Sequence, residues 1–229
     1  MSGCFAQYVL RKEGGVYKIS DSTSFEQAAI TEPLADVVRS IRRSRLSFGQ
    51  TCVIVGAGIM GLLHVQMAKN VGARVIVSEV DPVRRANAQK AGADIVINPM
   101  EVDPVKFVMD LTDGYGVDVV FYAIAISKLF DQHLKMVCPE GRIMIYSNQI
   151  PDDPYELKLG ALHGSNKEII GTVGYAEKDA LRALEMVAFG KVKMDLVISE
   201  TFPITQCKEA FDASIVPLTY RVVIKMDEE

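Results

Sequence analysis

The stretch that decides the fold begins TCVIVGAGIMG at residues 51–61 and closes ARVIVSE at residues 73–79. Its order predicts a strand, a glycine turn, a helix, a second strand and a terminal acid. Gly56, Gly58 and Gly61 fit the pattern G-x-G-x-x-G, whose glycines allow a tight turn, close approach of a pyrophosphate and close packing of the helix on the sheet. The N-terminus of that helix offers unpaired N–H groups to phosphates. The stretch therefore predicts a dinucleotide site.

The acid at the end of the second strand indicates which dinucleotide binds. The carboxylate of Glu79 is expected to accept hydrogen bonds from the adenosine ribose and to repel a 2′-phosphate, which favours NAD over NADP. Arg84 and Arg85 follow one turn later and could contact a phosphate. Two alternatives remain: a glycine turn that serves packing alone, and a methyltransferase site for S-adenosylmethionine, which also combines a glycine turn with an acid.

Composition limits the class of protein. The 229 residues are 49% hydrophobic and 24% charged, which suits a globular chain with a sizeable core. A net charge of −4 gives no electrostatic reason to expect nucleic acid or an anionic membrane. No run approaches the roughly twenty apolar residues of a membrane helix, and no secretory signal opens the chain. The four cysteines are scattered, which predicts reduced thiols in a cytoplasmic protein.

Strands and helices alternate from Thr51 onward, and such alternation predicts an α/β fold: a doubly wound, six-stranded parallel sheet of the Rossmann type. Helices are expected between the first five strands, with Ser127 as the N-cap of the last of them. The pyrophosphate is expected outside the carboxyl end of the first strand. The strand candidates are residues 52–55, 75–78, 95–97, 117–122, 142–146 and 168–172.

The flanking segments are less regular. Extended pieces are expected at residues 4–10, 16–19, 194–198 and 220–225, and helices at 33–45, 176–189 and 204–213. Ser24 and Gln27 form a capping box that starts a helix at Phe25. The arginines of the second helix (Arg39, Arg42, Arg43 and Arg45) are expected to form its solvated face. His64, His133 and a loop residue, His163, are expected to be surface or hydrogen-bonded residues rather than ligands.

Several stretches together carry a family resemblance: Gly3-Cys-Phe-Ala-Gln-Tyr-Val, Val16-Tyr-Lys-Ile, Phe25-Glu-Gln-Ala-Ala, Glu32-Pro-Leu-Ala, the glycine turn, Ala91-Gly-Ala-Asp-Ile-Val-Ile-Asn-Pro, Gly114-Tyr-Gly-Val-Asp-Val-Val-Phe and Tyr220-Arg-Val-Val-Ile-Lys. In order and spacing the chain resembles the medium-chain, zinc-type dehydrogenases, near the sorbitol, threonine and sugar-alcohol branch. The resemblance implies an NAD-binding Rossmann domain at residues 36–174. It also implies that residues 1–35 and 175–229 are remnants of a β-rich catalytic lobe.

The resemblance also assigns cofactor residues. It places Ile59 and Met60 at the pyrophosphate turn and Arg84 near the adenine, as in NAD enzymes of the family. It places Ala123 and Ile124 at the end of the fourth strand, followed by Ala125, which crowds a position where the family has glycine. The segments lining the nicotinamide are Tyr146, Ser147, Asn148 and Thr172, Val173, Gly174, with Tyr175 bordering the substrate.

The resemblance leaves only one residue of the family's zinc site in this chain. In the family a cysteine and a histidine–glutamate pair hold the catalytic zinc, and all precede the point where this chain starts. Glu32 matches a further carboxylate ligand, but one carboxylate cannot hold zinc, which takes three or four ligands. We therefore expect the NAD(H)-binding portion of a dehydrogenase that oxidises a secondary alcohol or polyol, inactive alone and without zinc. The alternative is a non-catalytic dinucleotide-binding or dimerisation module. A homo-oligomer through the sheet edge at residues 168–172 is expected, because an unpaired edge invites pairing.

Overall fold

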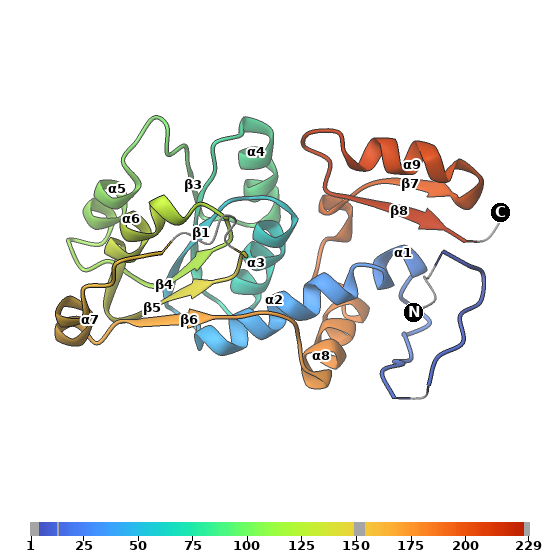
Figure 1. The fold of residues 1–229 in the computed structure, drawn as a ribbon, viewed down its shortest axis with the longest axis horizontal. Helices are drawn as coiled ribbons and strands as arrows, with labels where there is room; N and C mark the ends of the chain where they lie inside the picture. Colours follow the sequence, from blue (N-terminus) through green and yellow to red (C-terminus); the bar gives the residue numbers. More distant parts are fainter. Residues whose placement is uncertain (1–4, 13, 149–153, 227–229) are drawn as a thin grey trace.

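A parallel six-stranded sheet organises the molecule. The computed structural model describes residues 5–12, 14–148 and 154–226. The strand order is β3-β2-β1-β4-β5-β6, and every neighbouring pair is parallel (Figure 1). Successive strands are added on one side of β1 as far as β3, and then on its other side from β4 to β6. This change of side at β1 and β4 confirms the predicted Rossmann arrangement. The strands are β1 (Thr51–Val55), β2 (Arg74–Ser78), β3 (Ile95–Ile97), β4 (Val117–Tyr122), β5 (Val137–Ile145) and β6 (Glu168–Gly171).

Both faces of the sheet are buried, each under its own helices. In β1, Cys52 and Ile54 belong to one core cluster, while Val53 and Val55 belong to the other. The first cluster packs α2 (Thr31–Ser44), α3 (Ile59–Asn70), α4 (Pro82–Ala91) and α8 (Glu177–Ala188) on the sheet. The second packs α5 (Pro104–Leu111) and α6 (Phe130–Lys135). Burial on both faces explains why the strands are apolar throughout rather than alternating.

β5 begins at Val137, five residues before the expected start at Arg142. The intervening Pro139-Glu140-Gly141 contains residues that disfavour strands, and Glu140 indeed has φ of 62°. The ladder with β4 accommodates them, because its register shifts between Val117 and Val119. Pairing with a neighbouring strand thus overrides a local turn signal.

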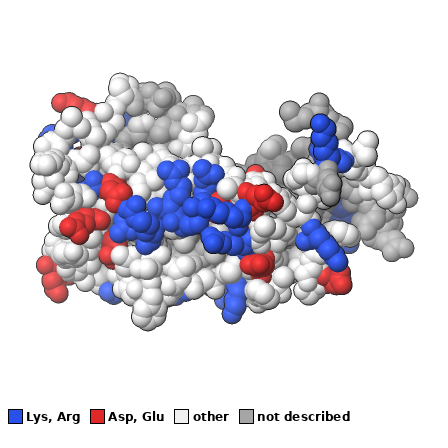
Figure 2. All heavy atoms as spheres, turned by 90° about the horizontal axis from the view of Figure 1, so that it is seen from below, with Lys and Arg blue, Asp and Glu red and all other residues white. Residues whose placement is uncertain are grey.

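The helix α2 starts two residues earlier than expected and packs against α8. Its arginines only partly form the expected solvated face. Arg42 donates two hydrogen bonds to the fully buried Asp179 on α8, at 2.9 and 3.0 Å, and Arg45 pairs with Glu168 on β6. Figure 2 shows lysines and arginines gathered on this lower face of the molecule. The arginines therefore join α2 to later parts of the chain as well as facing solvent.

A second, two-stranded sheet lies apart from the first. β7 (Ile198–Pro203) and β8 (Arg221–Lys225) run parallel, joined through α9 (Cys207–Ser214) (Figure 1). The expected strands at residues 4–10 and 16–19 are wrong for the described residues of those segments, which form no strand; Cys4 lies outside the described residues. None of the strands in the described part of the chain forms a ladder with these segments. The extended piece expected at residues 194–198 is wrong too, since Met194–Leu196 is a 3-10 turn.

Of the smaller local predictions, some are confirmed and others are wrong. The capping box of Ser24 and Gln27 is confirmed and starts α1 (Phe25–Ala28). Ser127 caps no helix; it begins the 3-10 turn Ser127–Leu129 that precedes α6. His163 lies in a helix, α7 (Leu159–Ser165), and not in a loop.

Within the described ranges, no helix has the length and apolar character needed to cross a membrane.

Candidate functional site

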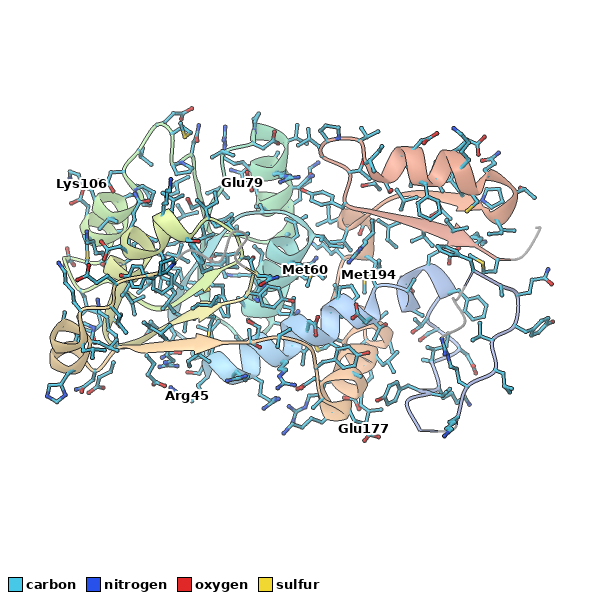
Figure 3. The ribbon with its side chains drawn as sticks, viewed as in Figure 1. Arg45, Met60, Glu79, Lys106, Glu177 and Met194 are labelled. Atoms are coloured by element: carbon cyan, nitrogen blue, oxygen red, sulfur yellow. The ribbon has the colours of Figure 1, made fainter. Side chains whose placement is uncertain are left out.

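The glycine turn lies between the end of β1 and the start of α3, with Met60 in the first turn of that helix (Figure 3). Gly56 has φ of +91°, a conformation that side chains disfavour. A Cβ on Gly61 would lie 2.0 Å from the carbonyl oxygen of Gly56, so only glycine lets the helix approach the turn so closely. No atom lies within 4 Å of a Cβ built on Gly58, the N-cap of α3. The turn thus leaves open space beside the free N–H groups of the helix start.

Glu79 follows β2 and faces this turn (Figure 3). It is only 6% exposed, and its carboxylate accepts hydrogen bonds from the backbone N–H of Ala57 at 2.6 Å and of Asp81 at 2.9 Å. The side chain therefore fastens the glycine turn to the loop that opens α4. Each carboxylate oxygen can accept a further bond, so a ribose hydroxyl remains a chemically suitable partner.

Two arginines lie next to Glu79 and are used differently. The Arg85 guanidinium donates to the carbonyl oxygens of Glu79 at 3.1 Å and of Val80 at 2.6 Å. The Nε of Arg84 is buried and has no hydrogen-bond partner in the structure. Of these two arginines, Arg84 is therefore the one whose Nε donor is unpartnered.

The carboxyl ends of the central strands meet at the same edge of the sheet. Beyond β4, Ala123 and Ile124 adjoin the glycine turn, and the Cγ2 of Ile124 would lie 2.8 Å from a Cβ on Gly56. Beyond β5 come Tyr146, Ser147 and Asn148, with the Tyr146 N–H bonded to the Tyr122 carbonyl at 3.2 Å. Parallel strands end together, so these segments and the glycine turn lie on one side of the molecule.

The segment after β6 completes this edge. The N–H of Thr172 bonds to the carbonyl of Ile145 at 3.1 Å, while its buried hydroxyl has no partner in the structure. Val173 is 88% exposed, and Gly174 has φ of +63°. These residues thus place a buried, unpartnered hydroxyl and an exposed Val173 beside the end of β5.

The sequence of this chain is similar to those of known dehydrogenases. Residues 60–188 match the family model described as zinc-binding dehydrogenase. The chain belongs to the zinc-binding dehydrogenase family. It is 32% identical to D-arabitol-phosphate dehydrogenase of Enterococcus avium over 234 residues, covering 100% of this chain and 65% of the relative. It is 34% identical to L-threonine 3-dehydrogenase of Thermococcus kodakarensis over 231 residues, covering 97% and 64%.

A solved relative shows the same fold. The crystal structure of 2R,3R-butanediol dehydrogenase from Bacillus subtilis superposes with a TM-score of 0.83 at 25% identity, over 91% of this chain and 60% of that one. The chain spans about 65% of the length of the D-arabitol-phosphate and L-threonine dehydrogenases named above. The family and the Rossmann-like sheet expected from the sequence are confirmed.

The family raises the question whether residues of this chain suit a zinc ion. Glu32 is exposed in the first turn of α2, and Asp36 follows one turn later. Burial, then the charge of Glu32, raises the pKa of Asp36. In the described part of the chain no group of three or more His, Cys, Asp or Glu side chains could hold a metal. Among the described residues, Glu32 and Asp36 do not by themselves fit a zinc site.

The histidines have structural roles or lie elsewhere. His64 is fully buried on α3, with Nδ1 2.7 Å from the Met60 carbonyl and Nε2 2.9 Å from the Ser40 hydroxyl. Burial lowers its pKa to about 4, so the imidazole stays neutral at physiological pH. His133 is likewise buried, with Nδ1 2.7 Å from the Leu129 carbonyl. The expectation that they are hydrogen-bonded rather than metal ligands fits these contacts.

One residue that contacts the glycine turn was not predicted from the sequence. The hydroxyl of Tyr220, which precedes β8, lies 3.3 Å from the carbonyl oxygen of Ala57 in the glycine turn. No local pattern could have shown this, because the two residues are 163 positions apart. Elsewhere, a cavity of about 580 Å³ lies among residues 6–8, α1 and β8, and none of the expected cofactor residues lines it.

Proposed function

We propose that this chain is the NAD(H)-binding portion of a zinc-binding dehydrogenase that oxidises a secondary alcohol, polyol or sugar alcohol. The observation that carries the proposal is the glycine turn. Gly58 leaves open space beside the start of α3, and a buried acid, Glu79, closes the adenosine side. The named activities of the relatives, which act on a sugar alcohol phosphate, threonine and butanediol, support this substrate class.

The chain's own residues would bind and orient the cofactor. NAD, when bound, accepts a hydride at its nicotinamide ring. The N–H groups at the start of α3 would hold the pyrophosphate, because a helix N-terminus favours negative charge. Glu79 and Arg84 would lie at the adenosine end. The segments 146–148 and 172–174 would line the nicotinamide, where the buried hydroxyl of Thr172 has no partner within the protein.

The cofactor preference can be measured by titrating the protein with NADH and NADPH. We expect NADH to bind more tightly, by roughly tenfold or more, because a charged Glu79 repels a 2′-phosphate. The variant Glu79→Gln removes the charge and also one of the two hydrogen bonds that the carboxylate accepts from the N–H groups of Ala57 and Asp81. Both affinities should therefore fall, while the difference between NADH and NADPH narrows. Isothermal titration calorimetry gives both constants, and equal affinities in the unaltered protein would contradict the preference for NAD.

We further propose that these residues alone do not oxidise alcohols, because Glu32 is the sole carboxylate carried over from the family's zinc site. We expect no NADH formation from sorbitol, threonine or 2,3-butanediol by the purified 229-residue chain with added zinc, while NADH still binds. Absorbance at 340 nm follows the reaction. Zinc-dependent turnover above a chelator-treated control would refute this.

A second candidate function is a non-catalytic dinucleotide-binding module. It is favoured because no group of three His, Cys, Asp or Glu side chains among the described residues could hold a metal.

We also propose that the protein forms a homodimer through β6. This strand ends the sheet and pairs with β5 on one side only, so its outer backbone groups are open to another strand. Light scattering should show about twice the chain mass. Gly171→Pro should produce monomers because it removes a backbone donor, while Gly171→Ala should remain dimeric; no atom lies within 4 Å of a Cβ at this position. A monomeric unaltered protein would disprove the dimer.

The three described thiols bear on location. Cys52, Cys138 and Cys207 are free, and the first two are buried. Burial raises the pKa of both buried thiols, so they remain protonated and unreactive. Thiols kept this way suit a reducing compartment, and a cytoplasmic location is proposed on that ground.

A further inference from the structure

The peptide groups of Ala57, at the centre of the glycine turn, are held from two sides. Its N–H donates to the carboxylate of Glu79 at 2.6 Å, and its carbonyl oxygen accepts from the hydroxyl of Tyr220 at 3.3 Å. Ala57 itself is completely buried. Glu79 comes from the strand next to the turn, as the sequence pattern leads one to expect. Tyr220 lies immediately before β8 of the second sheet.

Tyr220 reaches the turn because of how the C-terminal unit folds. Figure 1 shows the connection from α9 to β8 turning back beside α4. There the Tyr220 hydroxyl also accepts a hydrogen bond from Nδ2 of Asn87 on α4, at 3.3 Å. Burial is the main cause that raises the pKa of this phenol, and the nearby charges of Arg84 and Glu79 also act on it. The hydroxyl is thus a protonated donor fixed between α4 and the glycine turn.

We propose that Tyr220 is a positioning residue of the dinucleotide site, which holds the glycine turn in the shape that receives a pyrophosphate. The proposal rests on the proposed cofactor function. A turn whose backbone groups are already fixed loses less conformational freedom when a ligand binds, so its affinity is higher. Glu79 fixes one side of Ala57, and without Tyr220 the carbonyl side would be free to move.

The test uses Tyr220→Phe, which keeps the ring and removes only the hydroxyl. In the ligand-free protein, amide hydrogen exchange should become faster in peptides that cover residues 56–61, with the rest of the sheet unchanged. The dissociation constant for ADP-ribose should rise about two- to tenfold, the range for one lost neutral hydrogen bond. Adenosine, which has no phosphate to place on the turn, should bind both proteins alike when followed by NMR.

Matched variants keep the outcome clear. Tyr115→Phe alters a tyrosine that is 62% exposed and should change none of these readouts. Asn87→Ala removes the other partner of the hydroxyl and should weaken ADP-ribose binding in the same direction, by less. It also serves if Tyr220→Phe does not fold. Unchanged exchange at the turn, unchanged affinity for ADP-ribose, or an equal loss for adenosine would each overturn the role of Tyr220. Failure of the unaltered protein to bind ADP-ribose would instead overturn the cofactor function itself.

Discussion

Replacing Gly61 with alanine should abolish measurable NADH binding and lower the melting temperature. The new Cβ would lie 2.0 Å from the Gly56 carbonyl oxygen and 2.9 Å from its carbon, so α3 or the turn must move. Such overpacking in a buried place costs about 1–3 kcal/mol, and each kcal/mol lowers the melting temperature by roughly 2–4 °C in a domain of this size. Calorimetry and NADH titration on the same sample measure both effects.

Gly58→Ala is the matched control, because it separates binding from folding. Gly58 has φ of −64° and no atom within 4 Å of its Cβ, so alanine fits the ligand-free protein without strain. The methyl group would occupy space that a pyrophosphate needs. We expect an unchanged melting temperature with NADH binding weakened at least tenfold. Normal NADH affinity in both variants would show that this turn does not hold the cofactor.

Removing Arg42 should strongly destabilise the protein. Asp179 is fully buried, accepts two hydrogen bonds from Arg42, and also accepts from the N–H of Ala176 at 3.1 Å. Arg42→Ala would leave a buried carboxylate without its cation, which costs about 3–5 kcal/mol. We expect about 3 kcal/mol, the lower end, because the Arg42 side chain is 34% exposed and partly screened by water. Denaturant unfolding at pH 7 measures the loss.

The same pair predicts a pH dependence. The hydrogen bonds from Arg42 lower the pKa of Asp179 below its ordinary value of 3.8. A carboxyl whose folded pKa is depressed stabilises the protein above its unfolded pKa, and this contribution is lost as the pH falls through the folded value. In Arg42→Ala the hydrogen bonds that most lower this pKa are lost, while burial, which raises it, remains. The gap in stability between the variant and the unaltered protein should therefore be largest at neutral pH and shrink progressively as the solution is made acidic. A gap that widened with acid would contradict this account.

Lys106→Ala supplies the control for that experiment. Lys106 pairs with Asp110 one turn away on α5, and both side chains are well exposed. Exposed pairs of this kind contribute little to stability, because water screens both charges. Its removal should hardly change the free energy of unfolding, which distinguishes the buried pair from a surface one.

Prediction from sequence succeeded where the signal was local or periodic. The six apolar runs and the helical stretches between them predicted a parallel six-stranded sheet, because strands joined by helices pair in parallel. The capping box at Ser24 is equally local, and the structure contains it. Prediction failed at residues 5–10 and 16–19, where extended backbone had no partner strand. It also misplaced the start of β5, where pairing with β4 overcame Pro139 and Gly141.

At the candidate site, too, local features were predicted from the sequence and long-range contacts were not. By itself the sequence determined a Rossmann sheet with a glycine turn, since the spacing of glycines and the apolar period follow from steric rules acting over a few residues. Only the tertiary structure decided what the polar groups around that turn contact. Glu79 turns inward to Ala57 and Asp81, Arg42 meets Asp179 across 137 positions, and Tyr220 reaches the turn from its place immediately before β8. These contacts depend on how distant segments pack, and packing is a property of the whole fold rather than of any stretch within it.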